Sequence, residues 1–452
     1  MPTRRKSIYF LSLELENVRC FAEEQELRLV DSNGRPARWT LLVGDNGVGK
    51  TTLLQCLAWM RPTPYYPPGK DEQKGIQPLL HDQYPPVMAN LFRDGAGITT
   101  LRAEMVQISS LTSQLPRTAR VRTGIEVLSK NNKFDGAKRT VNEPQKAVDP
   151  FIITYGANRH MGHQNAGESP ESGSVDLLQT DDTELVDAAE VLSDLDYSAY
   201  QKRPKARARL EKMKHALAEI LPFIAKSDDI EILGPQQPGG SDESGGLRFR
   251  TPYGRVPLEG LSLGHRTVTA WIVDLAWRLI VRYPESAKPL EEPAVVLIDE
   301  IDLHLHPHWQ RRIMKQLSEH FPNVQFVATT HSPLMITSLD EVNVAVLRQV
   351  DDGDHVVIKT GPTVVEGWRF DQILVNLFGL ESARSLRVEE LMKERERLLG
   401  KKRRTPRDRE QLQHIADELS SLPTAERRED QDAMDFVRRA AAAFRARQEE
   451  QK

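Results

Sequence analysis

Eight consecutive residues, 44–51, have the types and spacing of a phosphate-binding loop. Their sequence GDNGVGKT matches G-x-x-x-x-G-K-[ST] and stands between a strand pattern (TLLV) and a helical pattern (TLLQCLAWM), the context that this motif requires. Glycines let backbone amides curl around phosphate oxygens, Lys50 reaches the terminal phosphates, and the Thr51 hydroxyl can ligate Mg²⁺. A chance Gly-rich turn is the alternative, and the flanking context disfavours it. The residues expected to bind ATP here are Gly44, Asn46, Gly47, Gly49, Lys50, Thr51 and Thr52.

Two carboxylates end the apolar run AVVLIDE at 294–300. A strand beside the phosphate loop would deliver both of them to the nucleotide. Asp299 would hold magnesium through water, and Glu300 would orient or deprotonate the attacking water, because in-line phosphoryl transfer needs a positioned nucleophile. A purely structural acidic turn is the alternative. The phosphate loop in the same chain favours the catalytic interpretation.

A histidine follows the next apolar strand pattern, VQFVATT, 31 residues after Glu300 (331 − 300). The carboxyl ends of neighbouring parallel strands meet at one edge of a sheet, so His331 is expected to sense the γ-phosphate of ATP, although a structural histidine is the alternative. A second group, His304, His306 and His308, suggests a metal site. Pro307 is expected to open a helix, which would prevent these side chains from sharing one helical face, so a metal site is disfavoured.

Several strand and helix patterns surround these residues. Alternating apolar residues between 9 and 43 predict strands, 62–150 is interpreted as an inserted β-rich lobe with strands in 98–130, and 151–156 predicts a buried strand. About 160–200 is interpreted as a flexible insertion rich in polar residues. Helices are predicted at 205–224, 267–281 and 308–321, with strands at 229–233, 294–298, 324–330 and 344–350 and a hairpin within 245–258. Strands alternating with helices predict an α/β fold with a largely parallel sheet.

The composition narrows the class of protein. The chain has 452 residues, enough for two or three domains or for one large α/β unit with insertions. No apolar run is long enough to cross a membrane, and two cysteines, Cys20 and Cys56, cannot build a disulfide framework, so a cytoplasmic location is expected. The formal net charge of −4 argues against a uniformly basic surface for nucleic acid but leaves room for a local basic groove.

In this order, these motifs resemble the ABC-type ATPases of the RecF, SMC and OLD group, a branch of the AAA-family ATPases. The resemblance implies a P-loop NTPase head with ATP and Mg²⁺ as cofactors. In that family a signature segment of the type L-S-x-G binds the γ-phosphate of ATP held by another subunit. LSLGHR at 261–266 occupies its place, so Ser262 and Gly264 inherit the role, which implies a head-to-tail homodimer or higher oligomer. A serine hydroxyl and glycine amides at a helix start suit an anion.

Two further family elements are matched unequally. The D-loop corresponds to IDLH at 301–304, which places Asp302 near the dimer interface, and LHLHPHWQ resembles the version common in OLD-like ATPases. The Q-loop corresponds to YGANR at 155–159, where no glutamine stands, so Asn158 or Arg159 is the substitute. No long heptad repeat separates the two halves, so the SMC-type coiled-coil arm is missing.

The charged, helical region 361–452 resembles the C-terminal region of ATPases of bacterial anti-phage defence systems, of the PtuA type found in Septu systems. It is expected to hold a partner or another subunit, although packing on its own ATPase core (1–360) is the alternative. Basic residues at 401–404 are interpreted as a solvated helix end, with nucleic-acid or partner contact as the alternative, and 351–354 as a hairpin turn.

The sequence therefore predicts an ATP-hydrolysing sensor or regulator of an anti-phage defence complex. Its effector would be a separate nuclease of the HNH or Toprim type, since no Toprim domain follows residue 350. DNA or RNA is a possible ligand. A RecF-like repair ATPase that binds DNA and a nucleotide-dependent scaffold with little turnover are the alternatives.

Overall fold

The structure is a computed structural model that describes residues 7–64, 76–79, 91–108, 111, 120–131, 133–142, 150–164, 183–221, 223–233, 246–339, 341–350, 353–364, 370–380, 384–401, 403 and 405–420. It divides into two compact units, Met1–Gly379 and Leu380–Lys452. The first unit extends past residue 360, the domain boundary that the sequence predicts, and includes helix α9.

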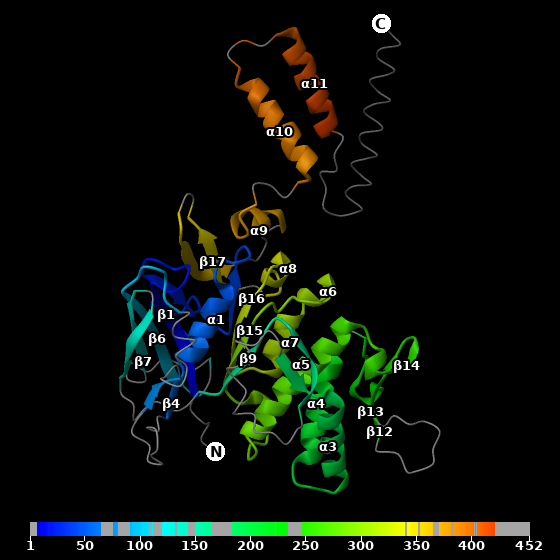
Figure 1. Cartoon of the computed structure of the whole chain (residues 1–452). Coiled ribbons are helices and arrows are strands. Elements are labelled where there is room, and N and C mark those ends of the chain that lie inside the picture. Colours follow the sequence, from blue (N-terminus) through cyan, green and yellow to red (C-terminus); the bar gives the residue numbers. More distant parts are fainter. Residues whose placement is uncertain are drawn as a thin grey trace, which may run out of the picture. The chain divides into compact units, whose positions relative to one another are not determined.

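The chain forms both strands and helices, with strands predominating before residue 187 and helices more frequent after it (Figure 1). The strands are β1 (Ser7–Glu16), β2 (Gln25–Arg28), β3 (Trp39–Val43), β4 (Pro62–Pro64), β5 (Ile76–Pro78), β6 (Ile98–Ile108), β7 (Arg120–Lys130), β8 (Lys133–Val141), β9 (Ile152–Tyr155), β10 (Arg159–Gln164), β11 (Thr183–Val186), β12 (Ile230–Leu233), β13 (Gly246–Thr251), β14 (Gly254–Pro257), β15 (Ala294–Ile298), β16 (Val324–Thr329), β17 (Glu341–Gln349) and β18 (Val356–Val364). The helices are α1 (Lys50–Trp59), α3 (Ala188–Tyr200), α4 (Ala206–Ile220), α5 (Leu263–Arg282), α6 (Pro307–Gln310), α7 (Ile313–His320), α8 (Pro333–Ile336), α9 (Phe370–Asn376), α10 (Leu386–Leu399) and α11 (Pro406–Ser420).

A six-stranded sheet in the order β18-β17-β3-β16-β15-β9 forms the centre of the first unit. Strands β17, β3, β16, β15 and β9 run parallel, and β18 is antiparallel to β17. The α/β fold and the largely parallel sheet that the sequence predicted are confirmed. Because all five parallel strands point the same way, the residues that follow β3, β15 and β16 meet at one edge of the sheet.

Alternate residues of each central strand enter two different cores, which explains why the strands are apolar throughout. In β15, Val295 and Leu297 pack into a core with α1, β1 and β6, whereas Val296 and Ile298 pack into a second core with α3, α4, α5 and α7. Figure 1 shows α1 between the sheet and β1, β6 and β7, with α3, α4 and α5 on the opposite side. The sheet is therefore covered on both faces.

Within the segment expected as an inserted lobe, β4 and β5 pair with each other, whereas the longer strands join a sheet with the N-terminal strands. Strands β6, β7 and β8 pair with the N-terminal strands in an antiparallel sheet of order β2-β1-β6-β7-β8. Its inner face is joined to the central sheet by Gln325, whose side-chain amide accepts from the Phe10 N–H and donates to the Phe10 carbonyl, both at 2.9 Å. The side-chain amide of Gln325 thus makes the same two hydrogen bonds with Phe10 that the backbone of a neighbouring strand would make. These bonds hold the two sheets in a fixed relative position.

Two predictions of helix and loop are wrong in part. Residues 188–200, placed in a flexible insertion, form α3, because Asp187 accepts from the Ala189 and Glu190 amides as an N-cap and the apolar residues at helical spacing are buried. Residues 165–182 of that insertion lie outside the described residues. The single helix predicted at 308–321 is divided into α6 and α7 at Arg311 and Arg312. The long helix α5, the helix α4 and the hairpin β13–β14 are confirmed.

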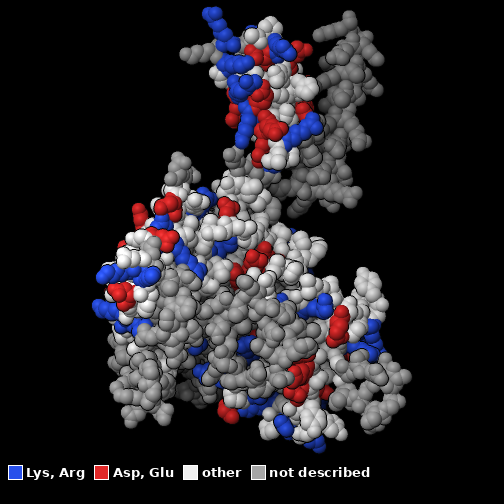
Figure 2. All heavy atoms as spheres, viewed as in Figure 1, with Lys and Arg blue, Asp and Glu red and all other residues white. Residues whose placement is uncertain are grey.

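The second unit contains a pair of helices, α10 and α11, with Val388, Leu398 and Ile415 buried. Lys401 donates to Asp408 at 2.7 Å, and this aspartate also accepts from the Thr405 amide. These two bonds tie the end of α10 and the loop after it to the first turn of α11. On the face shown in Figure 2, basic and acidic side chains are mixed over this helix pair. Residues 421–452, which include the apolar pattern AMDFVRRAAAAF, lie outside the described residues.

Candidate nucleotide site

The phosphate loop begins at the end of β3 and continues into α1, as the sequence predicted. Gly49 is the N-cap of α1, with φ +90° and no side-chain hydrogen bond at the cap, so the first amides of the helix are not covered by a capping side chain. A Cβ atom on Gly49 would lie 2.6 Å from the Cys20 Sγ, and one on Gly44 would lie 2.5 Å from the Leu347 carbonyl oxygen. Both positions therefore require glycine. A helix N-terminus without a capping side chain is suited to an anion.

Lys50 lies with its ammonium against the loop itself. Nζ donates to the carbonyl oxygens of Gly44 at 2.9 Å and Asp45 at 2.8 Å. Burial lowers the pKa of this ammonium, while the charges of Asp299 and Glu300, among others, act in the opposite direction. The lysine is held within the curl of the loop, beside the first amides of α1.

Asp299 is the centre of a hydrogen-bond network between three segments. Thr51 Oγ1 donates to Asp299 Oδ2 at 2.7 Å, and Thr329 Oγ1 donates to Asp299 Oδ1 at 2.6 Å. The Glu300 amide in turn donates to Thr329 Oγ1 at 2.7 Å. The structure thus brings together Thr51 and Asp299, which are 248 residues apart in sequence. Thr329 was not among the predicted site residues; its signal was a hydroxyl at the end of an otherwise apolar strand.

Glu300 and His331 lie on neighbouring turns at the same sheet edge. Glu300 has φ +49°, a left-handed conformation that few non-glycine residues adopt. The His331 backbone amide donates to the Asp302 carboxylate at 3.3 and 3.4 Å to its two oxygens, and the His331 side chain is exposed. Asp302, predicted near a dimer interface, therefore contacts the loop of His331 within its own chain.

Ser262 and Gly264 stand at the start of α5, where the resemblance placed them. Ser262 is the N-cap, and its Oγ accepts from the His265 amide at 3.4 Å; the serine itself is exposed. A Cβ on Gly264 would lie 2.4 Å from the His304 carbonyl oxygen. The start of α5 is therefore packed against residue 304 of the segment that follows Glu300, and only glycine permits this approach.

The segment 155–159 is the expected Q-loop. It presents an arginine to residues 299–303, which follow β15 and are called the acidic turn below. Arg159 is buried, whereas Asn158 is exposed. The Arg159 guanidinium donates to the carbonyl oxygens of Gly156 at 2.9 Å, Asp299 at 2.7 Å and Glu300 at 2.7 Å. Burial lowers the pKa of Arg159 to about 10, against the opposing effect of the nearby Asp299, Asp302 and Glu300 charges. Of the two substitutes proposed from the sequence, only Arg159 contacts the turn.

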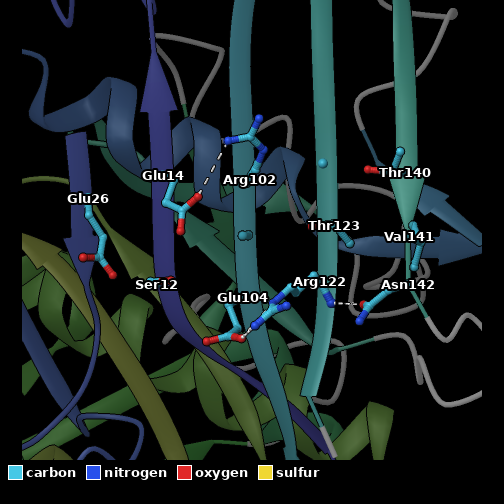
Figure 3. Close-up of a pocket in the computed structure, with 12 residues that line it drawn as sticks. Ser12, Glu14, Glu26, Arg102, Glu104, Arg122, Thr123, Thr140, Val141 and Asn142 are labelled. Carbon is cyan, nitrogen blue, oxygen red and sulfur yellow. Dashed lines mark hydrogen bonds and ion pairs between the residues drawn. The ribbon is translucent and has the colours of Figure 1, made fainter. Parts of the chain in front are cut away.

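The histidines at 304–308 and one surface hollow are two further polar groups in the described part of the chain. His306 caps α6 through its own side chain, with Pro307 in the first turn, and its ring stacks on that of His308. Among the residues that the structure describes, no group of three or more His, Cys, Asp or Glu side chains could hold a metal ion. A separate hollow, on the outer face of the five-stranded sheet, is lined by charged and small polar residues such as Glu14, Arg102 and Thr140 (Figure 3). No residue of the phosphate loop lines it.

The family model described as "AAA domain, putative AbiEii toxin, Type IV TA system" matches residues 40–337 of the chain. Among curated proteins, the "Retron Vc95 probable ATPase" of Vibrio cholerae serotype O1 biovar El Tor is 42% identical over 233 residues, 49% of this chain and 40% of that protein. The "Septu protein PtuA" of Bacillus mycoides (strain KBAB4) is 25% identical over 392 residues, 86% of this chain and 47% of that protein. The chain thus spans less than half the length of either relative.

A solved structure with a similar arrangement is the "SMC head domain from Thermotoga maritima", 14% identical, with a TM-score of 0.41 over 78% of this chain and 99% of that one. Among the described helices, none is long and apolar enough to cross a membrane.

Proposed function

The chain belongs to the AAA-domain family whose model spans residues 40–337, and from that premise we propose that it binds ATP with Mg²⁺ and hydrolyses it to ADP and phosphate. The observation that carries the proposal is the 2.7 Å hydrogen bond between Thr51 Oγ1 and Asp299 Oδ2. It joins the end of the phosphate loop to the acidic strand end. A hydroxyl and a carboxylate are oxygen donors of the kind that Mg²⁺ prefers, so these residues fit the cation that an ATPase of this family requires.

Each residue has a distinct task in this proposal. The first amides of α1, with Gly44, Asn46, Gly47, Gly49 and Thr52 around them, would bind the phosphates, and the Lys50 ammonium would exchange its two carbonyl partners for phosphate oxygens. Thr51 and Asp299 would hold Mg²⁺, which offsets the negative charge that develops on the transferred phosphoryl group. Glu300 would orient the attacking water and accept its proton. His331, exposed at the neighbouring turn, would contact the γ-phosphate.

We infer that the active form is a head-to-tail dimer or a higher oligomer. Ser262 and the adjacent helix start are exposed. An anion site of this kind is able to accept the γ-phosphate of ATP held by a second copy of the chain. Gly264 packs on residue 304 of the segment that follows Glu300. Binding of a second subunit at the start of α5 would therefore shift this segment and, with it, the backbone around Glu300.

The biological role that we propose is the control of an effector in anti-phage defence. Two relatives are named as components of retron and Septu systems, and the Septu protein matches over 86% of this chain. Helix α10 exposes the apolar side chains of Leu386, Met392 and Leu399 among charged residues, and exposed apolar side chains on an amphipathic helix are able to pack on another protein. We propose that this region holds a separate nuclease of the HNH or Toprim type.

ATP turnover by the purified full chain tests the enzymatic proposal. Glu300→Gln keeps the size of the side chain but removes the base, so it should bind ATP with wild-type affinity while phosphate release falls by about 10²–10⁴-fold. Lys50→Ala should instead lose tight ATP binding. Turnover by Glu300→Gln equal to that of the wild type would refute the role of Glu300. Tight ATP binding with no turnover by the wild type would favour a nucleotide-dependent scaffold.

Mixing subunits tests the composite site. Ser262→Arg places a bulky cation where the neighbour's phosphate would lie, and Lys50→Ala removes binding at the other half of the site. Each variant alone should be inactive. A mixture should recover part of the wild-type rate, because a mixed dimer has one site with an unchanged Lys50 from one subunit and an unchanged Ser262 from the other. A wild-type monomer with full activity at high dilution would contradict the dimer.

Purification together with neighbouring gene products tests the proposed role. A nuclease that co-purifies with the full chain and is lost on truncation after about residue 379 supports the effector model, provided that the truncated chain still binds ATP. Binding of DNA ends or gaps by the isolated chain would favour the RecF-like alternative.

A further inference from the structure

The buried guanidinium of Arg159 has an unusual set of partners for an arginine. It spans three backbone carbonyl oxygens, of Gly156, Asp299 and Glu300, at 2.7–2.9 Å. Two of these belong to the acidic turn itself. A planar guanidinium presents several N–H donors in a rigid fork, so one side chain is able to fix the relative position of neighbouring peptide groups in a way that lysine cannot.

The turn that Arg159 contacts needs support from outside. Glu300 has a left-handed backbone conformation, which is unfavourable for a non-glycine residue and persists only where the surroundings hold it. Thr329 holds the turn at the Glu300 amide, and Arg159 holds it at the carbonyls of Asp299 and Glu300. The position of the Glu300 carboxylate depends on this backbone.

Arg159 also lies against the helix whose N-terminus is Ser262. Its guanidinium carbon is 5.9 Å from the centre of the Trp271 ring of α5. Tyr155, at the end of β9, donates to Asp274 of the same helix at 2.7 Å. The segment 155–159 is thus bound to α5 at one end and to the acidic turn at the other.

We propose that Arg159 is a positioning residue for ATP hydrolysis, which grips the backbone of the acidic turn and thereby sets the Glu300 carboxylate against the attacking water. The proposal rests on the proposed function of Glu300. It differs from the role sought for a glutamine, because the Arg159 side chain acts through backbone carbonyls and not through contact with nucleotide or metal. Because Arg159 also contacts Trp271, a movement of α5 would change the position of the Arg159 side chain and therefore of the acidic turn.

Two variants and two measurements test the proposal. Arg159→Met removes the charge and the fork, and Arg159→Lys keeps the charge but lacks the fork. Both should lower kcat by about 10²-fold, since small displacements of a reacting group have effects of that size, while the dissociation constant of ATP changes by less than about threefold. Gln325→Leu is the control for loss of stability, because it removes a buried side-chain amide that clamps the two sheets and has no bond to the acidic turn.

Hydrogen exchange provides a readout that does not depend on turnover. The amides of Asp299, Glu300, Ile301 and Leu303 are bonded in the described turn. In Arg159→Met and Arg159→Lys these four amides should exchange severalfold faster than in the wild type. The exchange rates of the α3 amides should stay unchanged and serve as the reference. Wild-type exchange in Arg159→Met would overturn the proposal, and so would faster exchange with a wild-type kcat. If the wild type does not hydrolyse ATP, the proposed function fails, and the exchange rates alone decide whether Arg159 holds the turn.

Discussion

The two large sheets of the first unit place their polar groups in opposite ways. The six-stranded sheet is covered on both faces, so its charged and hydroxyl side chains gather at the edge where β3, β15 and β16 end. The five-stranded antiparallel sheet has one face in solvent, where Glu14, Glu104 and Arg102 alternate with buried apolar residues along the strands (Figure 3).

This difference separates residues that are held from residues that are free to move. At the edge of the central sheet, the side chains of Thr51, Asp299 and Thr329 are bonded across three different segments, and glycines stand where backbones approach closely. On the open face, ion pairs join side chains of neighbouring strands, and the arginines of these pairs are about half exposed or more. The same chemical groups should therefore tolerate substitution on the open face and not in or beside the covered sheet.

The largest expected effect is at Asp274, beside the covered sheet. Its carboxylate, with 0% exposure, accepts from Arg278, from the Tyr155 hydroxyl and from the Val186 amide. Asp274→Ala leaves the buried Arg278 charge unpaired and should lower the free energy of unfolding by about 3–5 kcal/mol, measured by urea denaturation. Asp274→Leu with Arg278→Met removes both charges and should recover part of the loss. If Asp274→Ala lowers the free energy of unfolding by less than about 1 kcal/mol, the polar groups beside the covered sheet are no more sensitive to substitution than those on the open face.

A matched pair of glycines gives an intermediate effect. A Cβ on Gly44 would lie 2.5 Å from the Leu347 backbone carbonyl, whereas a Cβ on Gly124 would lie 2.6 Å from the Thr140 side-chain hydroxyl. The backbone cannot move away, but the exposed hydroxyl can rotate. Gly44→Ala should therefore cost about 1–3 kcal/mol, and weaken ATP binding, while Gly124→Ala costs less than about 1 kcal/mol. Equal losses in the denaturation midpoint for the two variants would show that the faces do not differ.

The smallest effect is expected for Glu104, on the open face. It pairs with Arg120 at 2.8 Å and with Arg122 at 2.7 Å, and both arginine side chains are about half exposed or more. Glu104→Gln should change the free energy of unfolding by about 0.2–1 kcal/mol, because water and salt screen such pairs. The difference should shrink between low and high salt concentration. A loss that is large and independent of salt would indicate that this face is covered.

The local parts of the site could be predicted from the sequence. The phosphate loop, the strand that ends in Asp299 and Glu300, and the strand that ends before His331 each combine a short motif with its own flanking pattern, so no distant information is needed. The helix α3 was missed because its apolar residues follow a polar stretch, and its Asp187 cap was not recognised as a helix start.

The parts that depend on contacts between distant segments could not be predicted. Periodicity does not reveal that β1 pairs with β6, or that Thr329 bonds to Asp299. The sequence left Asn158 and Arg159 as equal candidates, because only the fold decides which of two adjacent side chains turns inward.

The order of strands in the central sheet has a consequence for how the chain folds during synthesis. Strand β3 is complete by residue 43, but its two neighbours, β16 and β17, lie at 324–349. The strands of the antiparallel sheet all lie within the first 141 residues, so that sheet is able to assemble early on the ribosome. At about 5–20 residues per second, β3 must then wait on the order of 15–60 s for its partners. We expect the nucleotide edge to form only after residue 329 has been synthesised, well after the antiparallel sheet, with the Gln325 bond to Phe10 then joining the two sheets.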